Sequence, residues 1–379
     1  MKYPASILIL SGLLLLFSAC GRNAATDAPG GIRAADSIRY ARNLRIEYAD
    51  DYISVRIRDP WDTLRLRQHY VLVDRNKPLP ARIPSDGTVI RIPATNTAIY
   101  TSVHTAIAEQ FGVLDRVAGV CEPQYITSEE VSRRITDGRI ADIGLASSPD
   151  IEKIVDIGTE LIIASPFENN GYGAAEKIGV PIVEAADYME NHPLGRTEWI
   201  LFYGLLLGCR EQAEAIFAET ERHYLELCKI AAQAVRRPTV VLERKYGPTW
   251  AVPAGGSYIG VLHADAGADY LFRDFTGTNV VHLNFEAVYD RAGEADCWFL
   301  KYDARSPLTY RMMQQEYPPY AHFRPWKERR IFACNTLESS YYDDITLHPD
   351  YVLEDLIALY HPELLPGHVQ RYYHPLADE

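Results

Sequence analysis

Ten aromatic, polar and basic side chains of this 379-residue chain follow short apolar runs, at places where strands are expected to end. Aromatic rings stack on flat or bulky ligands, while phenol and guanidinium groups bind carboxylates and phosphates. The set therefore favours a binding site for a large solute. Its members are Tyr100, His104, Tyr125, Asn170, Tyr172, Arg244, Tyr246, Trp250, Tyr302 and Tyr341. The chain holds 25 tyrosines, so a half-buried surface tyrosine explains any single one equally well.

Arg244, Lys245 and Tyr246 form the densest cluster of such groups, directly after the predicted strand 238–242. They would place positive charge in the binding site of a chain whose formal net charge is −13. A basic loop tip in solvent explains the same residues equally well. The net charge argues against nucleic acid as a partner and against tight adhesion to anionic lipid.

No catalytic motif accompanies these residues. The sequence lacks G-x-x-x-x-G-K-[ST] and H-E-x-x-H, which excludes a P-loop and a common zinc motif. Gly171-Tyr172-Gly173 lacks the third glycine of a dinucleotide fingerprint, and Gly256-Ser257-Tyr258 lacks the second glycine of a nucleophile elbow. Four histidines near the C-terminus are too irregularly spaced for a metal site. We expect no catalytic residue, no bound metal and no cofactor.

Apolar runs of strand length alternate with helical stretches from about Thr88 onward. Such alternation predicts βα units and a mainly parallel sheet. Strands are expected at 89–92, 117–120, 142–145, 161–164 and 181–183, with helices at 102–111 and 151–154. Because parallel strands end at the same edge of a sheet, the loops carrying the ten side chains should face one cleft.

A helical connector at 197–236 separates this first α/β lobe (88–196) from a second lobe (237–379). Gly208 should end a first helix, and a second helix of about 26 residues, roughly 39 Å long, starts near Arg210. Strands at 238–242, 297–300 and 331–333 and a final helix at 351–360 complete the second lobe. The predicted fold is α/β, with two Rossmann-like lobes joined by a long rigid backbone helix.

The N-terminus has the layout of a secretory signal, with Lys2, an apolar run at 7–17 and small residues before Cys20. The apolar run is too short to span a bilayer. Phe17-Ser18-Ala19-Cys20 resembles a bacterial lipobox, in which the cysteine is acylated; a plain signal peptide with a chance cysteine is the alternative. We expect a signal peptide at 1–20 and a periplasmic protein that a lipid on Cys20 alone holds to a membrane.

Two further segments precede the lobes. Residues 21–35 are rich in Gly, Ala and Asp and suit a flexible tether. Residues 36–87 should form a β-rich extension, because 45–58 contains two alternating runs around Asp50-Asp51 and 69–73 is a further strand candidate. The five cysteines after Cys20 show no C-x-x-C spacing, and we interpret them as buried apolar residues.

Segments in both lobes carry a further pattern. They are 111–120 (F-G-V-L-D-R-V-A-G-V), 142–144, 149–155, 160–163, 250–258 (W-A-V-P-A-G-G-S-Y) and 264–268 (A-D-A-G-A). In this order they resemble the helix-backbone class (class III) of periplasmic solute-binding proteins, which serve ABC importers of ferric siderophores, haem or vitamin B12. The resemblance implies a monomer without enzymatic activity, which captures a metal chelate between its lobes. It also implies an ABC permease and its ATPase as partners.

The same resemblance implies one docking glutamate on each lobe, which meets arginines of the permease. The matching positions are Glu152 and Glu286. Each lies at a predicted helix start, where a carboxylate is favoured by the helix dipole, so a simple capping charge is the alternative role. Two other functions stay open. One is a surface-tethered carrier that uses 36–87 to contact an outer-membrane partner; the other is a lipid-anchored enzyme acting on a metal complex.

Overall fold

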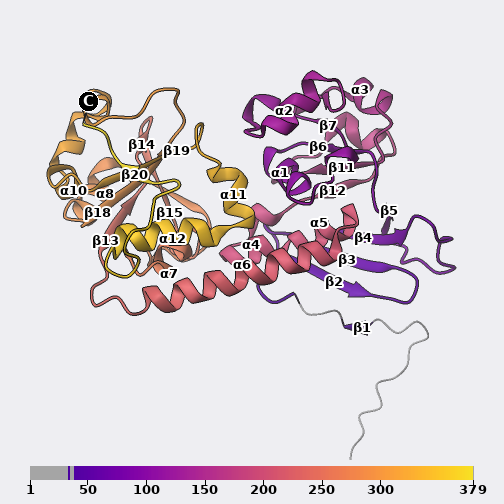
Figure 1. Ribbon diagram of the computed structural model, residues 1–379, viewed down its shortest axis with the longest axis horizontal. Helices are drawn as coiled ribbons and strands as arrows, with labels where there is room; N and C mark the ends of the chain where they lie inside the picture. Colours follow the sequence, from indigo (N-terminus) through magenta and orange to yellow (C-terminus); the bar gives the residue numbers. More distant parts are fainter. Residues whose placement is uncertain (1–32, 35–37, 379) are drawn as a thin grey trace, which may run out of the picture.

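The computed structural model describes residues 33–34 and 38–378. The predicted signal peptide, Cys20 and nearly all of the tether lie outside these residues. Within them, no helix combines the length and the apolar character that crossing a membrane requires. Figure 1 shows two α/β lobes side by side, with a further sheet below the first lobe and a long helix running along the lower side of the molecule.

The sheet below the first lobe is the N-terminal extension, with its five strands in sequence order. They are β1 (Arg33–Ala34), β2 (Leu44–Tyr48), β3 (Ile53–Arg58), β4 (Leu66–Asp74) and β5 (Thr88–Ile92). The β2–β3 hairpin confirms the turn predicted at Asp50-Asp51. The assignment of 89–92 to the first lobe is wrong, because β5 pairs with β4 and closes the extension sheet. An apolar run predicts a strand but does not choose its partner.

The first lobe contains a five-stranded sheet whose pairs are all parallel. In sheet order its strands are β12 (Ile182–Glu184), β11 (Leu161–Ala164), β6 (Thr97–Ile99), β7 (Val117–Val120) and β8 (Ala141–Asp142). A small hairpin, β9 (Gly144–Leu145) with β10 (Ser148–Pro149), follows β8. The helices are α1 (Ser102–Gln110), α2 (Glu129–Thr136) and α3 (Ile151–Asp156), with short 3₁₀ turns at Leu114–Arg116, Pro123–Tyr125, Gly173–Lys177 and Asp187–Met189.

Three helices connect the lobes: α4 (Pro193–Glu198), α5 (Ile200–Leu207) and α6 (Arg210–Ala231). Gly208 ends α5 with φ of 67°, and a Cβ there would lie 2.8 Å from Pro93, so only glycine fits this turn. The long helix α6 has 22 residues, which corresponds to about 33 Å. It is shorter than the predicted 39 Å because the chain leaves the helix after Ala231.

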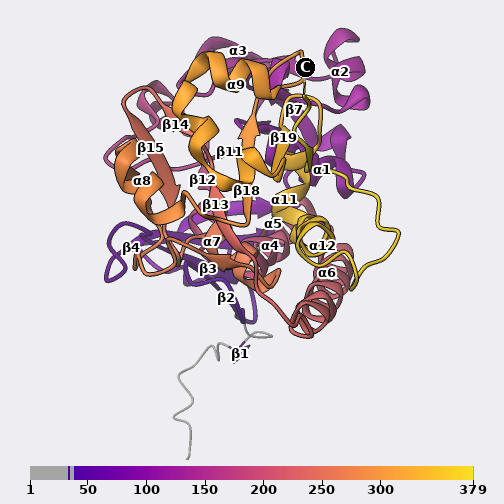
Figure 2. The same cartoon turned by 90° about the vertical axis from the view of Figure 1, so that its left-hand side faces the viewer.

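The second lobe is built on a sheet in the order β16-β13-β18-β19-β20, of which only β20 is antiparallel. Its strands are β16 (Asp269–Tyr270), β13 (Thr239–Leu242), β18 (Cys297–Tyr302), β19 (Ile331–Asn335) and β20 (His374–Pro375). A second, antiparallel sheet joins β14 (Lys245–Tyr246), β15 (Thr249–Pro253) and β17 (Val280–Leu283). The helices are α7 (Tyr258–Asp265), α8 (Phe285–Ala292), α9 (Tyr310–Glu316), α10 (Arg324–Lys327), α11 (Tyr341–Leu347) and α12 (Pro349–Tyr360). The turned view in Figure 2 shows α12 alongside α6.

The extension packs against the first lobe. Apolar residues of β2, β3 and β4 share one buried core with β6, β11 and α5. In addition, two buried carboxylates bind the backbone of the incoming chain. Glu198 accepts the N–H groups of residues 39–41 at 2.8 Å each, and Glu190 accepts those of Arg42 and Asn43 at 2.8 and 2.9 Å. The extension is therefore fixed to the connector.

Candidate functional site

A cavity of about 530 Å³ lies in the first lobe, at the carboxyl ends of β6 and β11. This size is within the range of small-ligand sites, and this edge of a parallel sheet is where such sites form. Its walls come from the segments after the two strands and from the β9–β10 hairpin. Three of the ten expected residues line it: Tyr100, Asn170 and Tyr172.

Two phenol groups give this cavity its chemistry. Tyr100 directly follows β6 and is 3% exposed, and Tyr172 lies in the loop after β11. Neither hydroxyl has a hydrogen-bond partner among the described residues, although both are buried. Burial raises the pKa of both phenols far above the ordinary value, so they remain neutral donors. An unpaired buried hydroxyl is costly, and each of these two belongs to a residue that lines the cavity.

The exposed side chains around the phenols are aromatic or polar. Phe167, which is 59% exposed, and Asn170 form an isolated bridge in the loop after β11. Ser147, Ser148 and Ser165 add hydroxyl groups to a wall that is otherwise apolar. A ring or bulky chelate can stack on Phe167 while its polar edge reaches the hydroxyls.

His104, one of the ten expected residues, does not line the cavity. It is 4% exposed, and its Nε2 lies 3.0 Å from Oδ1 of Asp187 and 3.1 Å from the hydroxyl of Tyr203. Its Nδ1 pairs with the hydroxyl of Thr101, which caps α1 and lines the cavity. Burial alone would raise the pKa of Asp187, but the attraction of His104 keeps it below the ordinary value. This network fixes α1 behind the cavity wall.

The second-lobe residues of the expected set do not line this cavity. Trp250 is fully buried and donates its indole N–H to the carbonyl of Leu242 at 2.9 Å, and Tyr341 is 1% exposed. Both rings pack in the core of the second lobe, and neither lines this cavity. Arg244 pairs with Glu316, and Tyr246 is 89% exposed on the β14–β15 hairpin.

The two remaining members of the set lie at the surface. Tyr302, at the end of β18, is half-buried. Tyr125 is 62% exposed in a 3₁₀ turn of the first lobe and lies outside the cavity. Tyr302 and Arg244 remain candidates for the second-lobe side of the site, since Tyr302 ends β18 and Arg244 is the second residue after β13.

The structure adds a charged pair that sequence reasoning missed. Lys301 in β18 and Glu243, directly after β13, form an ion pair where two neighbouring strands end. Glu243 has φ of 61°, a conformation that is uncommon for a residue with a side chain. Burial alone would lower the pKa of Lys301, but the attraction of Glu243 raises it above the ordinary value, so the amine stays charged. The available signal was a lone lysine inside the apolar strand C-W-F-L-K-Y.

The lobes contact each other through α11, which lies between them in Figure 1 and packs on α1. The hydroxyl of Thr127 donates a 2.6 Å hydrogen bond to Asp343 across this contact. A second cavity of about 530 Å³ lies here, between α1, α2 and α11. Its carboxylates, Glu109, Glu129, Glu130, Asp343 and Asp344, make it acidic. This site suits an anionic chelate less well than the cavity with the two phenols.

Glu152 and Glu286 occupy equivalent places on the two lobes. Each is exposed in the first turn of its helix, α3 or α8. Asp150 and Asn284 already cap these helices through 3.0 and 2.9 Å bonds to backbone N–H groups. Neither glutamate forms an ion pair with a residue in the described ranges. Their carboxylates are therefore available to a partner.

The histidine, cysteine and carboxylate side chains bear on whether the chain itself could hold a metal ion. Among residues 33–34 and 38–378, no group of three or more His, Cys, Asp or Glu side chains is placed to hold a metal ion. The cysteines in these ranges are unpaired, with Cys121, Cys297 and Cys334 buried and Cys209 and Cys228 half-buried.

Two α/β lobes, a helical connector between them and a cavity at the strand ends define a two-lobed solute-binding fold. The pattern of the periplasmic binding protein family matches residues 98–335, and the chain belongs to this family. A protein of Methanocaldococcus jannaschii that is named an uncharacterized lipoprotein is 25% identical to this chain, over 89% of this chain and 84% of its own length. Petrobactin-binding protein YclQ of Bacillus subtilis is 26% identical over 29% of this chain and 35% of its own.

Solved structures share the fold. The periplasmic heme-binding protein RhuT from Roseiflexus covers 71% of this chain and 99% of its own, with a TM-score of 0.54 and 18% identity. The vitamin B12 binding protein BtuF of Vibrio cholerae covers 73% of this chain and 99% of its own, with a TM-score of 0.52 and 14% identity. These likenesses confirm the predicted two-lobed α/β fold and the predicted family.

Proposed function

We propose that this chain is the solute-binding component of an ABC importer, and that it captures a metal chelate at the cavity of Tyr100 and Tyr172. The single observation that carries the proposal is this pair of buried, unpaired phenols at the strand ends of a two-lobed binding fold. Neutral phenols donate to the oxygens of hydroxamate, catecholate, carboxylate or phosphate groups. Names of relatives and fold neighbours that bind petrobactin, haem and vitamin B12 support a chelate as cargo.

The delivery steps belong to the same proposal. Glu152 and Glu286 would dock on permease arginines, because exposed carboxylates pair with guanidinium groups through charge-assisted bonds. An acyl group on Cys20 would hold the protein at the membrane, in keeping with the relative that is named a lipoprotein. Replacing Cys20 by Ser should move the protein from the membrane fraction to the soluble fraction. Retention in the membrane fraction would contradict lipidation at this residue.

The binding experiment is a titration of the mature chain, residues 20–379 with Cys20→Ser, against haem, cobalamin and a panel of ferric siderophores. Ligand absorbance should serve as the readout, since Trp250 is buried away from the cavity. We expect saturable one-to-one binding of one class of chelate without conversion. The absence of binding across the panel would contradict the proposal.

A second candidate is the lipid-anchored enzyme, and one observation favours it. Thr101, His104 and Asp187 form a hydroxyl–imidazole–carboxylate relay, and Thr101 is one of the residues that line the cavity. The same succession of a hydroxyl, an imidazole and a carboxylate occurs in the catalytic triads of hydrolases. Conversion of a bound chelate that Thr101→Val abolishes would favour the enzyme; intact ligand recovered after binding favours the binding protein.

A further inference from the structure

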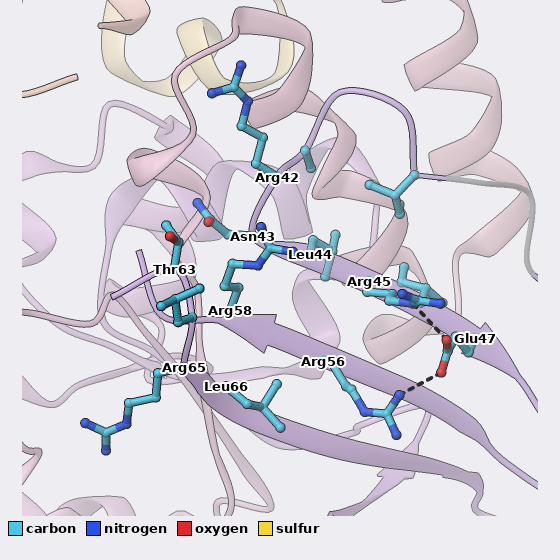
Figure 3. Close-up of a pocket in the computed structure, with 14 residues that line it drawn as sticks. Arg42, Asn43, Leu44, Arg45, Glu47, Arg56, Arg58, Thr63, Arg65 and Leu66 are labelled. Atoms are coloured by element: carbon cyan, nitrogen blue, oxygen red, sulfur yellow. Dashed lines mark hydrogen bonds and ion pairs between the residues drawn. The ribbon is translucent and has the colours of Figure 1, made fainter. Parts of the chain in front are cut away.

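The extension carries a strongly basic concave surface, far in sequence from the solute cavity. A hollow of about 920 Å³ is formed by β2, β3 and the segment that leads into β4. Five arginines and one glutamate line it: Arg42, Arg45, Arg56, Arg58, Arg65 and Glu47 (Figure 3). The local charge is thus positive, although the whole chain carries −13. We call these five arginines with Leu64 and Leu66 the basic surface.

Most of this positive charge is uncompensated. Glu47 pairs with Arg45 at 2.8 Å and with Arg56 at 2.9 Å. Arg42, Arg58 and Arg65 are exposed and form no ion pair with any residue in the described ranges. Figure 3 shows Arg58 between the other two, with the long side chains of Arg42 and Arg65 directed away from the sheet. Three guanidinium groups are therefore free to bind oxyanions.

An exposed apolar group accompanies these charges. Leu64 is 98% exposed in the segment between β3 and β4, and Leu66 is 43% exposed at the start of β4. Both line the same hollow as the arginines. A protruding leucine beside several arginines is the combination by which soluble proteins insert at the headgroup level of anionic bilayers. A site for a free small anion has no need of an exposed leucine.

The position of the basic surface relative to the chain start favours the same partner. β1, at Arg33–Ala34, pairs with β2, and β2 contributes to the hollow. Arg33 is thirteen positions after Cys20 in the sequence, a span of at most about 45 Å. The extension sheet is also fixed to the connector by Glu198 and Glu190. A partner that binds the basic surface would therefore also fix the position of both lobes.

We propose that the basic surface docks on the anionic headgroups of a lipid bilayer, with the arginines on phosphate groups and Leu64 inserted between them. This inference goes beyond solute capture and concerns a different part of the chain. The net charge of −13 argued against tight adhesion to anionic lipid. Screening limits charge effects to about 10 Å at 0.1 M salt, so the local arginines determine the interaction at this face. Contact through this face orients the lobes at the membrane.

The test is vesicle sedimentation with the mature chain, residues 20–379 with Cys20→Ser, which carries no acyl group. Vesicles of phosphatidylcholine with phosphatidylglycerol should bind the protein at about 50 mM salt, and binding should be lost at about 500 mM. Pure phosphatidylcholine vesicles should not bind it. The triple variant Arg42→Gln, Arg58→Gln, Arg65→Gln should bind roughly 100-fold more weakly, and Leu64→Ser about 10-fold more weakly.

The matched control removes three exposed charges elsewhere, through Lys229→Gln, Arg311→Gln and Lys327→Gln. It should bind like the parent chain, and thermal melts should show that all variants are folded. The proposal is overturned if the parent does not bind anionic vesicles at low salt, or if the control loses as much binding as the triple variant. Binding of inorganic phosphate without vesicle binding would also overturn it. Solute titration is unaffected by these outcomes, so the two proposals fail separately.

Discussion

Thr127 and Asp343 join the two lobes through a 2.6 Å hydrogen bond, although 216 positions separate them in the sequence. Thr127 precedes α2 of the first lobe, and Asp343 lies in the first turn of α11 of the second. This hydrogen bond stabilises the contact between the lobes at α11 and α1. Because the connector is helical, small changes at this contact are expected to control the opening.

The first prediction concerns the pH dependence of this contact. Burial raises the pKa of Asp343, and the nearby Asp344 and Glu109 add to the rise. The folded protein therefore retains this proton to higher pH than the unfolded chain. Its contribution to stability is present below the ordinary carboxyl pKa of about 4 and is lost as pH rises through the raised pKa. Denaturant unfolding across this window should show that the free energy of unfolding of the parent falls relative to that of Asp343→Asn as the pH rises, because the asparagine stays neutral. An unchanging difference would contradict the assignment.

The second prediction concerns the two phenols of the cavity. Tyr100→Phe and Tyr172→Phe remove buried hydroxyls that have no described partner, so stability should stay within about 1 kcal/mol or rise. Chelate affinity should fall about 5- to 10-fold for each variant, as expected for one lost hydrogen bond of about 1 to 1.5 kcal/mol. Tyr351→Phe, in α12 outside the cavity, is the control. Unchanged affinity in both cavity variants would place the solute elsewhere.

The third prediction separates packing from binding at Trp250. This ring stacks on Trp298, with centroids 5.3 Å apart, inside the second-lobe core. Trp250→Ala should lower the free energy of unfolding by about 3 to 5 kcal/mol, as for other buried aromatic residues. The milder Trp250→Phe should leave solute affinity within about twofold, since the indole does not line the cavity. A large loss of affinity in Trp250→Phe at native stability would show that this ring reaches the solute.

The fourth prediction tests docking. Reversing charge through Glu152→Lys and Glu286→Lys should abolish uptake in cells while solute affinity stays unchanged, because both carboxylates are exposed and make no described ion pair. The matched control is Glu211→Lys with Glu294→Lys, since both of these are exposed and Glu211 also lies in a first helical turn. Uptake should survive in the control. A loss of solute affinity in the first pair would mean that the glutamates belong to the solute site.

Sequence patterns predicted the fold well and the site in part. Strand and helix periods located the core strands of both lobes, because burial imposes those periods on the residues themselves. The same patterns did not distinguish a side chain that follows a strand and faces the cavity, as Tyr100 does, from one that turns into the core, as Trp250 does. That choice depends on the local backbone turn and on neighbouring volume, which a single sequence does not reveal.

Local charge was the second feature that the sequence patterns did not predict. The basic surface was not predicted, because its arginines are interleaved with apolar strand residues. The summed charge of the chain also hides a local excess of positive charge. The ion pair of Lys301 and Glu243 was not predicted either. The two residues are 58 positions apart and become neighbours only through the parallel pairing of β13 and β18. Long-range pairing of this kind follows from topology rather than from local sequence.

The last prediction concerns Glu198, which joins the extension to the connector. This carboxylate is 1% exposed and accepts three backbone N–H groups, from Arg39, Tyr40 and Ala41. Glu198→Ala would leave these donors unpaired, and each buried donor without a partner costs about 1 to 3 kcal/mol. We expect a loss of several kcal/mol, limited by the access of water to the partly buried chain. Glu198→Gln keeps one carbonyl acceptor and should lose less. The measurement is hydrogen exchange of residues 38–43, whose protection should fall in Glu198→Ala, while that of β18 stays unchanged. Equal loss in both segments would mean that the carboxylate stabilises the whole protein rather than the attachment of the extension.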